Sequence, residues 1–286
     1  QFSEKWMSLY QHSKYAAGPA DIFKHACLIQ ALSRLSVGFS YLETHSGSGL
    51  YSLGEDLLAS WHKGLKAVFS DLDEFPLFDN FRDVVMGMGY PELKVYPGSP
   101  LFSAKFAASA TLCEIDRSVA AELGGVVDRY YQQATVKGDD GFEALGNIGN
   151  LDETAVFIDP PYKDIDDYRR CIAAFSQLRS ACAVMVWYPL IDSAASSQLK
   201  TEFLNCFPMG CAEGTMTPSG ASRRFWGPVS RSWGRRERMD FVSKIVFSTT
   251  GARYSRMHCA VPFFPERSRL ASAPGMAGFL WGGHGR

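Results

Sequence analysis

The sequence lacks an apolar run as long as a membrane span, and its opening residues, QFSEKWMSLY, contain no apolar signal core. None of its seven cysteines forms a C-x-x-C pair, and several stand inside apolar runs. These patterns favour reduced core thiols over disulfides or a redox motif. We therefore expect a cytoplasmic protein that has no membrane partner.

Histidine and cysteine clusters at metal-ligand spacing are also missing, so we expect no metal. The formal net charge is only -1, but it is unevenly spread. Residues 221–286 hold 12 lysines and arginines against 3 acids, whereas the rest of the chain holds 17 against 27. A basic tail thus follows an acidic body.

The chain has 286 residues, 46% of them hydrophobic, which is enough for a large core in one domain with an insertion or in two domains. Short apolar runs alternate with segments of helical periodicity, as in largely parallel α/β sheets covered on both faces. One helix is expected to begin at Gly18-Pro19 and another to span 167–178. The expected strands are 39–43, 110–115, 134–136, 156–159 and 182–188.

Two segments interrupt this alternation. Residues 50–94 are helical in pattern, and we expect them to form a small insertion. After Gly220 the sequence becomes rich in Arg, Gly, Ser and Trp without a clean period, although 242–247 is a candidate strand. The expected division is therefore a core of 1–49 and 95–220, a helical insertion of 50–94 and a basic C-terminal segment of 221–286.

Glycines and acids follow several of the expected strands, where α/β proteins bind their ligands. In ETHSGSG (43–49), Gly47 and Gly49 would let backbone N–H groups approach a ligand, although a purely structural turn explains them equally well. Glu114 ends the next strand and has the chemistry to accept the two hydroxyls of a ribose. Asp140-Gly141 is by itself typical of a turn, but it would also suit an adenine ring.

The stretch VFIDPPY (156–162) ends an apolar strand with an acid and two prolines, which supply no backbone donors. Such a corner would hold the Asp159 carboxylate and the Pro160 carbonyl as two acceptors facing one point. Two acceptors on an amino group conjugated to an aromatic base would make its nitrogen nucleophilic through preorganised electrostatics. Tyr162 could stack on that base, whereas a plain strand-to-loop turn is the alternative.

The joint pattern resembles the RlmJ family of S-adenosylmethionine-dependent methyltransferases, which modify the exocyclic amine of an adenine in large-subunit ribosomal RNA. The resemblance covers about residues 10–220. It implies a Rossmann-like class I methyltransferase sheet with a small helical insertion. It rests on YQHSKYAAGPADIFKH (10–25), LETHSGSG, VYPGSP (95–100), the CE of LCEID, the DG of VKGDDGF, FIDPPY and VWYPL (186–190).

The resemblance also implies roles for individual residues. Asp159 would act on the amine with Pro160 and Tyr162, and Tyr10 would touch the RNA. The residues implied to contact S-adenosylmethionine are Lys24, His25, His45, Gly47, Ser99, Glu114, Asp140, Gly141 and Asp159. Taken singly, His25 fits a core histidine on a helical face, His45 an exposed polar residue and Ser99 a loop residue.

This sequence departs from the family pattern at two places. Gln11 precedes His12 where the family usually has arginine, and ASRRFWGPVSRS follows MTPSG where the family usually has an apolar strand and a second N-P-P motif. A divergent tail or an altered reading frame would explain the second departure, which puts the last strands of the sheet in question. The implied substrate is ribosomal RNA free of ribosomal proteins. The alternatives are a DNA adenine methyltransferase and a non-catalytic nucleic-acid-binding protein serving use of external DNA.

Overall fold

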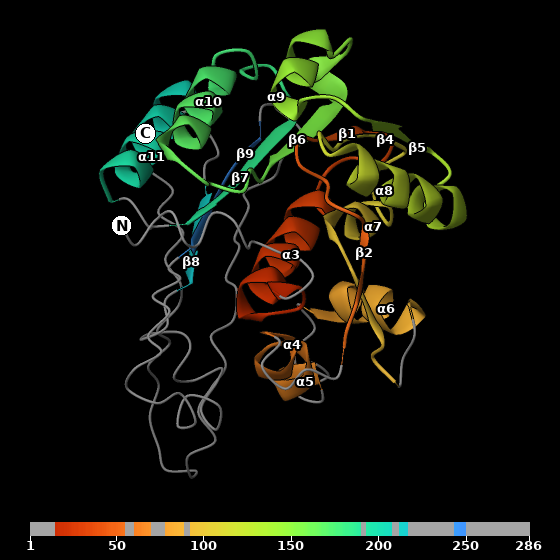
Figure 1. The fold of residues 1–286 in the computed structure, drawn as a ribbon. Helices are drawn as coiled ribbons and strands as arrows, with labels where there is room; N and C mark the ends of the chain where they lie inside the picture. Colours follow the sequence, from red (N-terminus) through yellow and green to blue (C-terminus); the bar gives the residue numbers. More distant parts are fainter. Residues whose placement is uncertain are drawn as a thin grey trace, which may run out of the picture.

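Seven strands form one twisted sheet in the computed structural model (Figure 1). The structure describes residues 15–54, 60–69, 78–88, 92–189, 193–207, 212–216 and 243–249. The strands are β1 (Ser40–Glu43), β4 (Ser109–Cys113), β5 (Ala134–Lys137), β6 (Thr154–Ile158), β7 (Ala183–Pro189), β8 (Ala212–Met216) and β9 (Ser243–Thr249). Their order is β5-β4-β1-β6-β7-β9-β8, in which β5, β4, β1, β6 and β7 pair in parallel. The expected α/β class and the five expected strands are thereby confirmed.

One strand of the sheet, β9, comes from beyond the expected core, whereas the edge strand β8 lies within it. β9 pairs antiparallel with both β7 and β8, so it lies inside the sheet. The candidate strand at 242–247 is therefore a strand, and the expected boundary at residue 220 does not coincide with the end of the sheet. The last strands, which the departure after Gly220 put in question, are both present.

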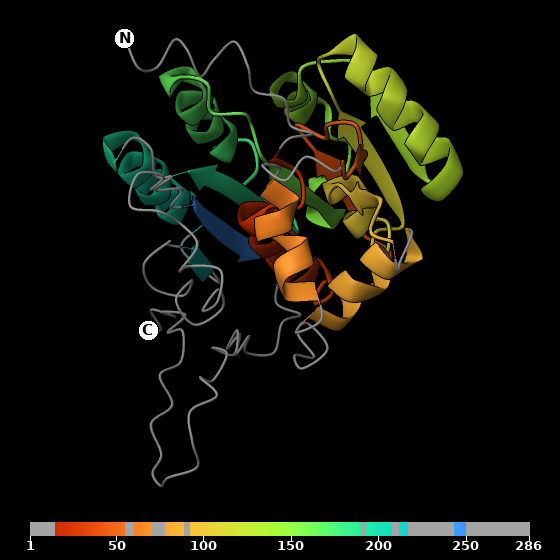
Figure 2. The same ribbon diagram turned by 60° about the horizontal axis from the view of Figure 1, so that its bottom comes forward.

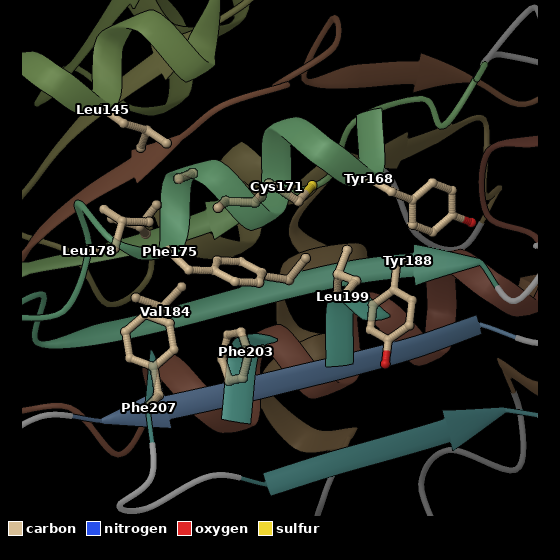
Figure 3. Close-up of a cluster of buried hydrophobic side chains, with 14 of the residues drawn as sticks. Leu145, Tyr168, Cys171, Phe175, Leu178, Val184, Tyr188, Leu199, Phe203 and Phe207 are labelled. Atoms are coloured by element: carbon tan, nitrogen blue, oxygen red, sulfur yellow. The ribbon is translucent and has the colours of Figure 1, made fainter. Parts of the chain in front are cut away.

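Helices cover the two faces of the sheet because successive strand residues point to opposite sides. On β6, Ala155 and Phe157 pack with α3 (Pro19–Leu32) and α8 (Arg117–Tyr130). Val156 and Ile158 pack on the opposite face with α10 (Ile165–Phe175) and α11 (Ser193–Cys206). Figure 3 shows this second layer, where Phe175, Leu199 and Phe203 meet Val184 of β7. The continuous apolar run of β6 thus reflects burial on both faces.

A smaller unit lies between β1 and β4 in the sequence. It contains α4 (Ser60–Lys63), α5 (Leu65–Val68) and α6 (Asp79–Gly87), which gather beside α3 in both ribbon views (Figures 1 and 2). It begins and ends with an antiparallel pair, β2 (Leu50–Ser52) and β3 (Val95–Pro97), so its first residues are a strand rather than a helix. The next helix, α7 (Ser99–Ser103), leads back to the sheet.

Three short helical segments complete the described structure: α9 (Gly141–Ala144), η3 (Leu145–Asn147) and η4 (Leu151–Glu153). In the part of the chain that the structure describes, no helix is long and apolar enough to span a bilayer. The described cysteines, Cys27, Cys113, Cys171, Cys182 and Cys206, are free thiols, and two of them are buried. Across the same residues, no group of three or more histidines, cysteines and acids is arranged to hold a metal.

Candidate active site

Four acidic side chains lie at the carboxyl ends of neighbouring parallel strands. Glu43 ends β1, Glu114 follows β4, Asp140 follows β5, and Asp159 follows β6. The strand register places Glu43 beside Leu112 of β4 and beside Phe157 of β6. The acids therefore share one edge of the sheet, which is where α/β folds bind their ligands.

A buried lysine joins α3 to the end of β6. The Lys24 ammonium lies 2.8 Å from Asp159 Oδ2 and 3.1 Å from Asp21 Oδ1. Asp21 in turn accepts a hydrogen bond from the backbone N–H of Ala17 through Oδ2. A buried ammonium needs such partners to offset its desolvation. Lys24, which the resemblance assigns to the cofactor, thus also fixes one oxygen of the candidate catalytic acid.

Glu43 is fully buried, with an exposed fraction of 0%. Its Oε2 accepts a hydrogen bond from the Tyr41 hydroxyl at 3.2 Å, and its Oε1 accepts one from Ser99. Burial raises the pKa of Glu43 to about 8; the nearby Asp159 also raises it, whereas Ser99, Tyr41 and Lys24 oppose the shift. Ser99 is therefore no loop residue: it is buried at the start of α7 and tied to β1.

The histidine beside Lys24 lies in an aromatic cage. His25 Nδ1 is 2.7 Å from the Tyr96 hydroxyl, and its ring packs against those of Tyr96 and Phe102. His25 is buried, so the expectation of a satisfied core histidine is met. Its assignment to the cofactor stays a prediction.

The glycine turn after β1 is connected directly to the acid after β4. The backbone N–H of Gly47 donates to Glu114 Oε2 at 3.1 Å, and that of Asp116 donates to Oε1 at 2.9 Å. Gly47 has a φ of +59°, and a Cβ there would lie 2.2 Å from the Tyr51 hydroxyl oxygen. The positive φ therefore favours glycine at this turn, and a Cβ would also have to displace the Tyr51 hydroxyl. Ile115, next to Glu114, leaves 65% of its surface exposed at the same edge.

Asp140 and Gly141 begin a helix rather than form a simple turn. Asp140 caps α9 by accepting the N–H of Phe142 through Oδ1 at 2.9 Å. A Cβ on Gly141 would lie 2.0 Å from the carbonyl oxygen of Thr44, so α9 can pack against the end of β1 only through glycine. The pair thus holds Asp140 close to the turn that follows β1.

His45 is half-buried, which differs from the expected exposed side chain. Its Nδ1 lies 2.8 Å from Thr44 Oγ1, and its ring meets Phe142 edge-on at a centroid distance of 5.1 Å. Burial lowers the pKa of His45 to about 4; Asp140 opposes this shift and Arg170 adds to it. The imidazole is therefore neutral at pH 7.

The D-P-P-Y segment leaves the sheet as a fixed corner. Pro160 is buried, and Tyr162 has a φ of +50°. The Tyr162 hydroxyl donates to the carbonyl of Trp187 at 2.7 Å, and its ring packs against Tyr168 at 4.7 Å between centroids. Tyr162 is thus anchored to the end of β7, and its stacking on a base stays a prediction. Tyr10, assigned to the RNA by the resemblance, lies outside the described residues.

Several residues of this site had no assigned role in the sequence. Glu43 was visible as an acid ending a strand, and Asp21 stands three residues before Lys24, a spacing that brings helical side chains together. Tyr96 and Arg170 gave no signal, because their partners are distant in the sequence.

Comparison with known proteins decides the family. The family model described as "Ribosomal RNA large subunit methyltransferase D, RlmJ" matches residues 36–206. The chain belongs to the RlmJ family. The resemblance seen in the sequence is thereby confirmed. Tyr10, Lys24 and His25 precede the matched segment, whereas the other assigned residues lie within it.

Named relatives support membership of the RlmJ family. Ribosomal RNA large subunit methyltransferase J of Haemophilus influenzae is 29% identical over 205 residues, which cover 65% of this chain and 71% of the relative. The Escherichia coli protein of the same name is 25% identical over 199 residues, with the same coverage. The crystal structure of protein LPL1258 from Legionella pneumophila superposes with a TM-score of 0.67 and 22% identity. It covers 82% of this chain and 86% of its own, and it supports the fold alone.

Proposed function

We propose that this protein transfers a methyl group from S-adenosylmethionine to the exocyclic amine of an adenine in large-subunit ribosomal RNA. The observation that supports the proposal most directly is how the two carboxylate oxygens of Asp159 are bonded. Its Oδ2 is held by Lys24, whereas within the described residues its Oδ1 has no hydrogen-bond partner. An acceptor is thus fixed in place at the end of β6 with one oxygen ready for a substrate donor.

The residues around Asp159 fit the cofactor. Gly47 and Glu114 offer a close backbone turn and a carboxylate, which suit a ribose, and Asp140 lies one strand further out. Glu114 uses one lone pair on each oxygen for the backbone, so each oxygen retains another acceptor position. When bound, S-adenosylmethionine supplies an electrophilic methyl group attached to a sulfonium.

The protein's own part in the reaction is to orient and polarise the amine. Asp159 Oδ1 and the Pro160 carbonyl would accept the two amine hydrogens, which turns the nitrogen lone pair toward the methyl group. Transfer of the methyl group from sulfur to nitrogen would leave the nitrogen positively charged. One of its protons then leaves to Asp159 or to water. Lys24 keeps the carboxylate in this orientation throughout.

The target base must be unstacked to reach Asp159, which costs a few kcal/mol in duplex nucleic acid and less in unfolded RNA. We therefore propose RNA free of ribosomal proteins as the substrate, modified in the cytoplasm. No metal is needed for this chemistry, because the sulfonium already activates the methyl group.

The direct test is methylation by the purified full-length chain with isotopically labelled cofactor. The substrates are deproteinised large-subunit RNA, assembled large subunits and duplex DNA, and digested nucleosides are identified by mass spectrometry. We expect labelled N6-methyladenosine from the free RNA, loss of the product in Asp159→Ala, and an unchanged rate in Asp128→Ala, which alters an exposed acid of α8. Label in DNA alone would favour the DNA enzyme, and no label in any substrate would favour a non-catalytic binding protein.

A further inference from the structure

Arg170 of α10 reaches out of its own helix to the acid that follows β5. Its Nη2 lies 2.6 Å from Asp140 Oδ2, and its Cζ lies 4.4 Å from the centre of the Phe142 ring. Asp140 Oδ1 is occupied by the Phe142 N–H. Arg170 and the start of α9 therefore hold the carboxylate from both sides.

Arg170 pairs with an acid that lies outside its own helix. Asp166 and Asp167 stand four and three residues before Arg170 on α10, at the spacing of helical ion pairs. Arg169 makes such a pair, with its Nη1 2.7 Å from Asp166 Oδ1, and both of those side chains are largely exposed. Arg170 instead crosses to α9, where the Asp140 side chain is only 19% exposed. Neighbouring arginines thus have different surroundings on one helix.

These contacts keep the Asp140 carboxylate negatively charged and fix its orientation. Burial alone would raise the pKa of Asp140, but the hydrogen bond and the charge of Arg170, together with the backbone N–H of Phe142, hold it below its ordinary value. Arg170 holds Oδ2 through one nitrogen and the Phe142 N–H holds Oδ1, so the two contacts together restrict the rotation of the carboxylate. Each oxygen still has a lone pair for a further donor.

We infer that Arg170 is a positioning residue for the adenine end of the cofactor: it orients Asp140 to accept the exocyclic amine of the adenine ring and so to select adenine over a 6-oxo purine. This inference rests on the proposed use of S-adenosylmethionine. A 6-oxo purine presents a carbonyl oxygen where adenine presents an amine, and that oxygen would face the Asp140 carboxylate without a hydrogen. Phe142, which lies under the guanidinium and meets His45 edge-on, would form the adjoining wall of the adenine site together with His45.

Calorimetric binding of two product analogues to the full-length chain tests this role without any RNA. S-adenosylhomocysteine and S-inosylhomocysteine differ at the purine 6-position. We expect the parent protein to bind the adenosine compound more tightly than the inosine compound. In Arg170→Gln this ratio of affinities should fall about threefold to tenfold, which corresponds to the loss of one hydrogen bond. Arg169→Gln, the matched control on the same helix, should keep the preference. Arg170→Lys, which retains the charge without the planar guanidinium, should lie between.

The outcomes separate this inference from the function on which it rests. An unchanged preference in Arg170→Gln, or an equal loss of affinity for both analogues, would overturn the role of Arg170 and leave the methyltransferase proposal standing. A parent protein that binds neither analogue would contradict both. A reduced preference in Arg170→Gln with an unchanged melting temperature without ligand would support a positioning role over a general effect on the fold.

Discussion

Lys24 Nζ lies 2.8 Å from Asp159 Oδ2, although the two residues are 135 positions apart in the sequence. The contact ties the helix after Gly18-Pro19 to the corner that follows β6. It also gives the two carboxylate oxygens different surroundings. Oδ2 binds the buried ammonium, whereas Oδ1 has no hydrogen-bond partner among the described residues. Substitutions of Asp159 therefore change both the geometry and the charge of the candidate catalytic centre.

Asp159→Asn distinguishes a role of Asp159 as a hydrogen-bond acceptor from a role as the acceptor of a proton. Asparagine keeps one acceptor oxygen and nearly the same volume but loses the charge. We expect a loss of at least ~100-fold in single-turnover methylation at saturating cofactor, the lower end of what a positioned proton-transfer group contributes. Asp159→Ala should abolish turnover and leave the fold intact. Activity of the asparagine variant within a few-fold of the parent would limit Asp159 to acceptor geometry.

Cofactor choice is the second prediction. Isothermal titration should detect binding of S-adenosylmethionine and none of NAD, because the turn at Gly47 meets the Glu114 carboxylate and is not part of a pyrophosphate-type G-x-G-x-x-G motif. Both Asp159 variants should bind the cofactor more weakly, since a negative charge near a sulfonium is favourable. Binding of NAD without binding of the methyl donor would contradict this assignment.

Gly141 provides a test of how α9 is docked. A Cβ at this position would lie 2.0 Å from the Thr44 carbonyl oxygen, whereas a Cβ on Gly138 would meet nothing within 4 Å. Gly141→Ala should therefore lower the free energy of unfolding by about 1–3 kcal/mol, the usual cost of overpacking. Gly138→Ala, the matched control, should stay within about 0.5 kcal/mol of the parent in urea unfolding. Equal values for the two variants would contradict the close packing of α9 on β1.

Glu43 should make stability depend on pH. Its pKa is raised from 4.5 to about 8, so between these values the folded protein keeps a proton that the unfolded chain releases. Its contribution is full below about pH 4.5 and is lost as the pH rises toward 8, by at most ~1.4 kcal/mol per pH unit. His45 acts in the opposite sense: its pKa is lowered from 6.5 to about 4, so its contribution is lost as the pH falls through that range.

Glu43→Gln isolates the first effect, because glutamine has the same shape and no titration. We expect its free energy of unfolding, relative to the parent, to increase steadily between about pH 5 and pH 8. Urea unfolding at several pH values measures this difference, and Glu122→Gln on the exposed side of α8 is the control. Parallel curves for Glu43→Gln and the parent would show that Glu43 is ionised in the folded protein throughout.

The basic tail is predicted to supply nonspecific affinity for RNA at most. Deleting 221–286 would also remove β9, which lies between β7 and β8, so charge substitutions are the better test. Replacing six arginines by glutamine should weaken RNA binding and reduce its salt dependence, by about 0.7 in log–log slope for each lost contact to single-stranded RNA. The six are Arg223, Arg224, Arg231, Arg235, Arg236 and Arg238. An unchanged affinity and slope in a folded protein would leave the tail without this role.

The edge of the sheet that carries the site could be predicted from the sequence because its signals are local. The apolar run before Asp159 and the acids after the other strands are readable in order, and parallel strands bring their carboxyl ends together. The helix start at Gly18-Pro19 was equally local. By contrast, nothing near β9 tells that it pairs between β7 and β8, since strand order depends on long-range packing.

The side-chain contacts and pKa shifts of the site could not be predicted from the sequence, because they also depend on long-range packing. Arg169 and Arg170 are adjacent arginines of one helix, and only the packing of α10 on α9 distinguishes the surface ion pair of the first from the Asp140 contact of the second. The partial burial of His45 was missed because the Phe142 ring that covers it comes from a distant segment of the sequence. The raised pKa of Glu43 likewise depends on burial that no local pattern reports.

The most direct measurement is mass mapping of modified adenines in large-subunit ribosomal RNA from cells with and without this gene. The account predicts that N6-methylation of an adenine disappears in the absence of the gene, returns with the parent protein and does not return with Asp159→Ala. An unchanged adenine methylation pattern in the ribosomal RNA of both cells would contradict it.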